Sequence, residues 1–378
     1  MYSVEAKDVL STISEAVSTS TLQYLDVSDN ALGLKGVRAL SVMLSGARPT
    51  LNTVFFNNNG LEGRAARLIS LLLTSEDHET AIAAVPAPSR DDTDAVLDEI
   101  IPSDSEADED VGLKTNLTKF HTFNNLMESA GARGLSRLLR SSPSLTDVRV
   151  SSTRISSDGA FSLAKAMLNL QFLQKLDLSD NTFGPDGAAA IATDILAKQA
   201  NLVHLNLAAT AIEDDGAIAV CKALAESKCK LQFLDMSCNE ITPNGADAIA
   251  ELLEGVKGTL KTFKISENEL GSSGIPILCS AFHKSEALET IDLSVNELTD
   301  AGAVVLAKVL PTLKELQKIE LNVNLIGQAG LEAVHSALKD VDRFDALGEM
   351  DLNDDEYEEE EEDVDDERIA GALAKLHL

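Results

Sequence analysis

Tryptophan is absent from this 378-residue sequence, and aromatic residues make up only 4% of it. A buried core must therefore be built from leucine, isoleucine, valine and alanine. Four cysteines are too few for a disulfide scaffold and are typical of a reducing compartment. No apolar run approaches the roughly 20 residues that span a bilayer, and the first residues lack the apolar segment of a signal peptide. We therefore expect a soluble intracellular protein.

Basic residues are scarce: 31 Lys and Arg stand against 62 Asp and Glu, for a formal net charge of −31. Such an acidic chain is not expected to bind nucleic acid. Most of the charge lies in residues 76–110 and 340–367, and blocks of like charge repel themselves and attract basic partners. We predict a disordered acidic insertion at about 76–112, an acidic tail at 340–367 and a short amphipathic segment at 368–378.

One pattern, L-x-x-L-x-L-x-x-N-x-L, recurs through the rest of the chain. Its clearest copies are LQYLDVSDNAL and LQKLDLSDNTF, and successive copies start 28 or 29 residues apart. The single larger step equals one repeat plus the first acidic block. The ten copies begin at Leu22, Leu51, Leu117, Leu145, Leu173, Leu202, Leu231, Leu260, Leu288 and Leu316. A fixed period of this kind is the signature of a leucine-rich-repeat solenoid.

Each part of the repeat predicts a piece of local structure. The L-x-L core is a short strand with alternating inward and outward side chains. The Asn follows the strand and can hydrogen-bond the backbone of the turn, and Thr153 and Thr210 replace it with a hydroxyl. A glycine six residues later, present in nine of the ten copies, precedes an alanine- and leucine-rich helix.

The fold class predicted for residues 1–339 is therefore α/β. We expect a ribonuclease-inhibitor-like horseshoe, with a concave parallel sheet, convex helices and each repeat contacting its neighbours. The segment 3–18 is expected to be the helical half of an incomplete first repeat that caps the sheet.

The sequence offers no catalytic chemistry of its own. No nucleotide-binding loop of the G-x-x-x-x-G-K-S/T type occurs, the six histidines are scattered without metal-ligand spacing, and the cysteines form no C-x-x-C pair. We expect no metal and no cofactor. Solenoids of this kind present a surface to another protein, so a protein-binding monomer that is not itself an enzyme is predicted.

Several strings resemble the Ran GTPase-activating proteins. LQYLDVSDNALGLKGVRAL, LTDVRVSSTRISSDGA and KLDLSDNTFGPDGAAA are similar to the plant branch, and the order of repeats, acidic run and ERIAGALAKLHL is similar to fungal members. The resemblance covers nearly the whole chain, without the plant targeting domain. It implies binding to Ran in its GTP form, with a Ran-binding protein as a further partner, and stimulation of hydrolysis in support of nucleocytoplasmic transport. It also implies a cytoplasmic location, or one at the nuclear envelope through a partner.

The resemblance also implies where the activity lies. Members of the family insert no arginine finger and stabilise the glutamine of the GTPase. In the string FHTFNNLMES the register gives Asn125 this role, with the neighbouring Asn124 as the second candidate. Asn125 is also the repeat Asn, so a purely structural role is equally open. The strand-to-helix loops are expected to contact Ran through Asp29, Asn30, Lys35, Asn58, Asn59, Arg64, Arg154 and Asp180.

Two features leave other functions open. Residue 1 falls just after the place where the family has an arginine in a Gly-Arg loop, so this chain is either shortened or does without that residue. A non-catalytic leucine-rich-repeat scaffold, or an acidic histone chaperone, would also account for the repeats and the acidic blocks.

Overall fold

The computed structural model of the chain describes residues 4–19, 21–88, 100–101, 112–353, 370–371 and 374. The predicted acidic segments fall partly outside this range, because residues 89–99, 102–111 and 354–369 are not among those described. The chain divides into two units, Met1–Asn201 and Leu202–Leu378.

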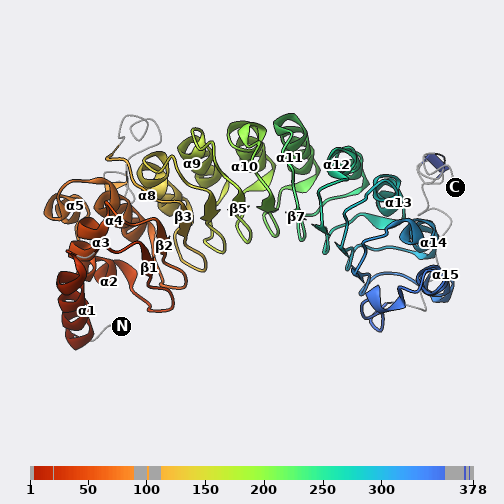
Figure 1. Ribbon diagram of the computed structural model, residues 1–378, viewed down its shortest axis with the longest axis horizontal. Coiled ribbons are helices and arrows are strands. Elements are labelled where there is room, and N and C mark those ends of the chain that lie inside the picture. Colours follow the sequence, from red (N-terminus) through yellow and green to blue (C-terminus); the bar gives the residue numbers. More distant parts are fainter. Residues whose placement is uncertain are drawn as a thin grey trace. The chain divides into compact units, whose positions relative to one another are not determined.

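In the first unit, parallel strands alternate with helices (Figure 1). The strands are β1 (Tyr24–Asp26), β2 (Thr53–Phe55), β3 (Lys119–His121), β4 (Asp147–Arg149) and β5 (Lys175–Asp177). The helices are α1 (Val4–Val17), α2 (Gly33–Ala39), α3 (Ser41–Ala47), α4 (Gly63–Thr74), α5 (His78–Ala84), α8 (Glu128–Arg140), α9 (Ser157–Met167), α10 (Gly184–Asp194) and the short 3₁₀ helix η1 (Leu196–Lys198).

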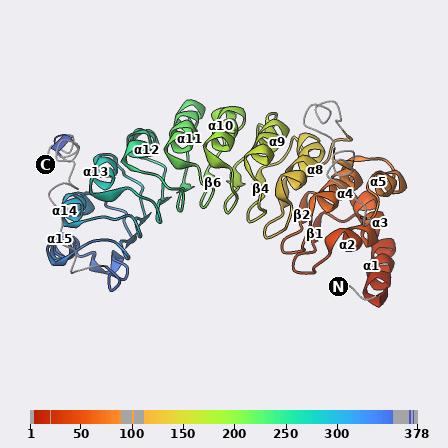
Figure 2. The same ribbon diagram turned by 180° about the vertical axis from the view of Figure 1, so that it is seen from behind.

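The second unit repeats the same alternation, which Figure 2 shows from behind. Its strands are β6 (His204–Asn206), β7 (Phe233–Asp235), β8 (Thr262–Lys264), β9 (Thr290–Asp292) and β10 (Lys318–Glu320). Its helices are α11 (Glu213–Ser227), α12 (Pro243–Val256), α13 (Gly271–Phe282), α14 (Asp300–Val309), α15 (Gln328–Lys339) and the 3₁₀ helices η2 (Leu310–Thr312) and η3 (Phe344–Ala346).

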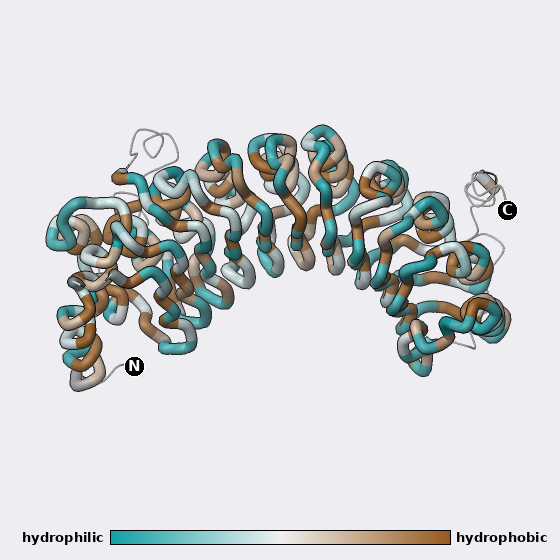
Figure 3. Tube along the Cα trace, viewed as in Figure 1, coloured by the Kyte–Doolittle hydropathy of each residue, from teal (hydrophilic) through white to brown (hydrophobic). Residues whose placement is uncertain are grey.

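The central residue of each strand points into the core, as the L-x-L pattern predicts. In the second unit the aligned central residues are Leu205, Leu234, Phe263, Ile291 and Ile319, and all five are fully buried. Figure 3 shows hydrophobic and hydrophilic residues alternating along the chain in every repeat. The predicted leucine-rich-repeat solenoid is confirmed as the fold class.

The repeat glycine lets each helix begin close to the turn before it. A Cβ added to Gly131 would lie 2.2 Å from the Cβ of Met127, and one added to Gly159 would lie 2.5 Å from the Cγ2 of Ile155. These apolar side chains are buried at the end of the turn. Close packing therefore favours glycine at this position, and only the second copy has alanine there, at Ala65.

The repeat asparagines form a buried ladder. Asn239, which is fully buried, donates from Nδ2 to the carbonyl of Leu207 in the preceding repeat (2.8 Å). Its Oδ1 accepts from the backbone N–H groups of Thr210 (3.0 Å) and Ile212 (3.3 Å). The Thr210 hydroxyl replaces part of the missing amide by donating to Leu207 (2.6 Å), as the sequence predicted.

Part of the predicted acidic insertion is folded, which corrects the expectation of disorder from residue 76. Asp77 caps α5 by accepting from the backbone N–H groups of Glu79 (3.2 Å) and Thr80 (2.8 Å). Ala81 and Val85 are buried, and α5 packs on α3 and α4. This part of the insertion folds because its apolar residues form a face that packs against the repeat helices.

The repeat fold also continues past the predicted boundary at residue 339. The backbone N–H of Gly348 donates to the carbonyl of Ile319 (2.9 Å), and Leu347 pairs with Ile319 in a parallel bridge. Asn353 accepts from the backbone N–H of Asn324 (2.9 Å) and so adds another rung to the ladder. Residues 340–353 therefore form a partial repeat rather than acidic tail.

Replacing Leu205 with alanine is expected to lower the free energy of unfolding by about 2–5 kcal/mol, because a fully buried side chain would leave a cavity. Urea unfolding followed by circular dichroism measures this. Val295→Ala is the control, since Val295 is 38% exposed and should change stability by less than about 0.5 kcal/mol. An equal effect of both substitutions would contradict the core assignment.

Candidate functional site

Asn125, the first candidate for the catalytic role, is 3% exposed and belongs to the buried ladder. Its Nδ2 donates to the carbonyl oxygens of Phe56 (3.0 Å) and Phe123 (3.2 Å). Its Oδ1 accepts from the backbone N–H groups of Asn59 and Leu61, both at 3.0 Å. The amide is thus committed to the turn backbone and cannot reach a partner without breaking these bonds.

Asn124, by contrast, lies on the surface of the strand-to-helix loops. Its Nδ2 donates to Oδ1 of Asn58 (3.1 Å), and Nδ2 of Asn58 donates to Oδ1 of Asp29 (2.8 Å). All three are exposed and take left-handed backbone angles, with φ between 50° and 63°. Asn and Asp tolerate this conformation better than other non-glycine residues. We call Asp29, Asn58 and Asn124 the outer ladder.

Other predicted contact residues are divided between the surface and the core. Asn30 is exposed, with Nδ2 donating to the carbonyl of Ser28 (2.7 Å), and Lys35 is exposed on α2. Asn59 is fully buried as the repeat Asn, and Arg64 is only 6% exposed. The expectation of a surface role for Asn59 and Arg64 is therefore wrong. Helix α8 packs closely on the first turn of α4, where a Cβ on Gly63 would lie 2.8 Å from that of Ala130.

Arg154 and Asp180 are both exposed in the loops of the next two repeats. Each takes a left-handed backbone angle, with φ of 58° and 53°. No ion pair joins these two described residues. Both remain accessible surface charges.

Sequence reasoning missed a row of side chains on the outward face of the first strands. Tyr24 lies edge-on to Phe55 (ring centroids 5.6 Å apart), and Phe55 stacks on His121 (4.3 Å, 11° between planes). Nε2 of His121 lies 2.7 Å from Oδ1 of Asp147. We call Tyr24, Phe55, His121 and Asp147 the aromatic row. The row could have been predicted from the sequence, because outward positions of adjacent repeats align in the predicted sheet.

A second group lies beside this row. Nε of Arg149 is 3.0 Å from Oδ2 of Asp177 and 2.9 Å from Oγ of Ser151. The guanidinium carbon lies 4.0 Å from the centroid of the Phe123 ring. Stacked cations and aromatic rings are typical of protein-binding surfaces.

The pair of His121 and Asp147 makes stability depend on pH. Burial raises the pKa of the Asp147 carboxyl, but the hydrogen bond from His121 and the positive charges nearby hold that pKa below its usual value. A carboxyl pKa lowered by folding adds stability above the unfolded pKa of about 3.9, and this stability is lost as pH falls through the folded value.

The free energy of unfolding of the native chain is therefore expected to fall more steeply below about pH 4 than that of Asp147→Asn. Urea unfolding between pH 7 and pH 2.5 checks this. Parallel curves for the two proteins would contradict the assignment.

Three of the four cysteines are buried in the repeat core. These are Cys221, Cys229 and Cys279, and Cys238 is exposed. Burial raises the pKa of the Cys221 thiol to about 12, so the nucleophilic thiolate is scarce at neutral pH.

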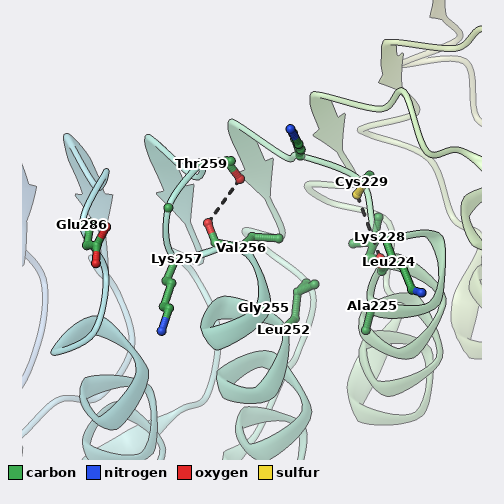
Figure 4. A pocket seen from close by; sticks show the side chains of 12 residues that line it. Leu224, Ala225, Lys228, Cys229, Leu252, Gly255, Val256, Lys257, Thr259 and Glu286 are labelled. Carbon is green, nitrogen blue, oxygen red and sulfur yellow. Dashed lines mark hydrogen bonds between the residues drawn. The ribbon is translucent and has the colours of Figure 1, made fainter.

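The second unit contains a pocket of about 470 Å³ at the helix-to-strand edge, next to the ends of α11 and α12 (Figure 4). Its buried wall includes Leu224, Cys229 and Val256, and Lys228 and Lys257 lie at its rim. Lysines at helix C-termini complement the helix dipole, which accounts for their position. The pocket contains no nucleophile paired with a base.

Over the described part of the chain, no group of three or more His, Cys, Asp and Glu side chains could hold a metal ion. None of the helices in that part is both long enough and apolar enough to cross a bilayer.

Comparison with known proteins agrees with the repeat fold. The leucine-rich repeat family pattern matches six segments, residues 19–41, 141–164, 169–192, 198–221, 227–250 and 284–307. These matches agree with the leucine-rich-repeat fold of the chain. Comparison with curated proteins found no match to the sequence.

Among solved structures, an internalin (inlF) from Listeria monocytogenes is similar at 15% sequence identity and a TM-score of 0.40. The match covers 88% of this chain and 92% of the internalin chain. Because the TM-score is below 0.5, the fold assignment rests on the strands and helices of this chain and on the repeat matches.

Proposed function

We propose that this chain is a GTPase-activating protein that binds Ran in its GTP form and stimulates GTP hydrolysis. The resemblance of its SDNALG, SSTR and DNTFG strings to that family supports the proposal. The observation that carries it is the exposed Asn124 amide, which the outer ladder holds at the end of a run of hydrogen-bonded side chains.

Asn124 is better suited than Asn125 to act on a partner. Its Nδ2 is oriented by Asn58, and its Oδ1 accepts no hydrogen bond from any described residue. That oxygen can accept from the side-chain amide of the glutamine in the GTPase, which orients the attacking water. A pre-oriented group needs little reorganisation when the reaction occurs.

The proposed partners follow from the same mechanism. Ran in its GTP form occupies the strand-to-helix loops of the first unit, and a Ran-binding protein joins the same complex. We propose a cytoplasmic monomer that uses no cofactor and catalyses no reaction without its GTPase. The glutamine and the nucleotide are supplied by Ran, so the chain itself needs only to position and stabilise them.

Single-turnover hydrolysis of GTP bound to purified Ran tests the proposal. Hydrolysis is expected to accelerate with increasing concentration of this chain and to saturate. Binding to Ran-GTP without acceleration would instead favour a non-catalytic scaffold. A complete lack of binding would overturn the proposal. The remaining hypothesis would be an acidic histone chaperone, and a measurement of binding to histones would test it.

A further inference from the structure

The outward face of β1 and β2 is aromatic and negatively charged. Tyr24 is 54% exposed, Phe55 is half-buried beside it, and Asp26 is exposed on the same strand as Tyr24. Asp29 adds a second carboxylate at the end of β1. The outward positions of these two strands, at Tyr24, Asp26, Thr53 and Phe55, contain no lysine or arginine. The face therefore carries negative charge beside the exposed ring of Tyr24 and the half-buried ring of Phe55.

Asp26 differs from the carboxylates on the outward side of β4 and β5. Asp147 is paired with His121, and Asp177 is paired with Arg149. Asp26 forms no ion pair with any described residue; its Oδ1 accepts from the backbone N–H of Ser28 (2.9 Å). Its Oδ2 accepts from the Tyr24 hydroxyl (3.4 Å).

These bonds hold the carboxylate in one place and in its charged form. The hydrogen bond with Ser28 is the main reason that the pKa of Asp26 lies below its usual value, and the nearby His121 adds to the effect. The Tyr24 hydroxyl ties the carboxylate to the edge of an exposed ring. A cation placed here would meet a carboxylate and a π-face together, a combination that suits a lysine or arginine side chain.

We propose that Tyr24, Asp26 and Phe55 form a docking site for a basic side chain of the partner protein. This inference rests on the proposed function, since Ran-GTP is the partner used to test it. The site selects and positions the partner, while Asn124 acts on the reaction. It lies on strands that lead into the outer ladder, because Asp29 follows β1 and Asn58 follows β2.

The test measures the Kd of Ran loaded with a non-hydrolysable GTP analogue, together with single-turnover hydrolysis at saturating protein. Asp26→Asn is expected to raise Kd about tenfold by removing the charge of the docking site. The saturating rate should stay within twofold of the native chain. The difference in Kd should shrink as salt rises, because exposed charges are screened over roughly 10 Å at 0.1 M.

The chain offers a matched control for the charge. Asp292 occupies the same strand position in β9, and its Oδ1 accepts from the backbone N–H of Ser294 (3.2 Å) as that of Asp26 does from Ser28. Asp292→Asn should leave Kd within twofold of native. Tyr24→Ala should weaken binding about as much as Asp26→Asn, whereas Tyr24→Phe keeps the ring and should retain most of the affinity.

The outcomes separate this inference from the proposed function. If the native chain neither binds Ran-GTP nor stimulates hydrolysis, both fail. If the native chain does both and Asp26→Asn behaves like Asp292→Asn, only the docking site is overturned. Thermal melting of each variant shows whether it is folded, and a folded Tyr24→Ala variant with native Kd would also overturn the site.

Discussion

Replacing Asn124 with alanine is expected to lower the saturating rate of Ran-GTP hydrolysis about 100-fold, in line with the loss of one pre-oriented hydrogen-bonding group. The Kd for Ran-GTP should change far less, because an interaction made mainly in the transition state affects the rate constant rather than binding. Stability should change little, since the side chain is exposed and Ala209 already takes a left-handed angle (φ 53°) at the same repeat position.

Ser152→Ala is the matched control for this experiment. Ser152 occupies the same position in the next repeat and has the same left-handed backbone (φ 52°). Its substitution should leave the saturating rate within twofold of native. A native rate for saturating Asn124→Ala would contradict the role of Asn124, and the outer ladder would then serve binding alone.

Replacing Asn125 with alanine is expected to lower the free energy of unfolding by at least about 3 kcal/mol. The substitution leaves the backbone N–H groups of Asn59 and Leu61 without their acceptor, and the carbonyl of Phe56 without its donor. Each buried group left unpaired costs about 1–3 kcal/mol. Urea unfolding measures the loss.

Asn30→Ala is the control for the buried ladder. Asn30 is the repeat Asn of the first copy and is exposed, so water can replace its hydrogen bonds and the loss should stay below about 1 kcal/mol. Hydrolysis at saturating Asn125→Ala, measured at a temperature where the variant is folded, should stay near the native rate. If the variant is folded but its saturating rate of hydrolysis is strongly reduced, Asn125 would be the residue that acts on the GTPase.

The sequence predicted the repeat fold well because the pattern reports burial directly. The leucines of L-x-L had to be inward, and Leu205 and its aligned neighbours are fully buried. The last partial repeat escaped prediction because Gly348 and Met350 replace its leucines, and only Asn353 keeps the pattern. The helix at residues 78–84 was not predicted, because the high net charge of the segment indicated disorder. The apolar side chains of Ala81 and Val85, which are buried, are too few to show in the composition.

The candidate site was harder to predict, since the pattern does not say which neighbouring side chains pair. It placed Asn124 and Asn125 in the right loop, but only the hydrogen bonds separate the exposed amide from the buried one. The aromatic row joins β1, β2, β3 and β4, whose residues lie up to 123 positions apart in the chain, from Tyr24 to Asp147. The burial of Arg64 was not predicted, because the composition of a helix does not show how closely the neighbouring helices pack on it.

The buried ladder also has a direction, and this bears on how the chain is made. Where a ladder Asn Oδ1 accepts, it accepts from the repeat before it, as Asn268 does from Asn239, Asn324 from Asn296 and Asn353 from Asn324. The Oδ1 of Asn296 is an exception, since it accepts from no described residue. A repeat leaving the ribosome therefore keeps buried N–H groups without an acceptor until the next repeat, 28 or 29 residues later, has emerged. Folding during synthesis should lag one repeat behind the exit tunnel, and a chain halted mid-repeat would have a frayed final rung.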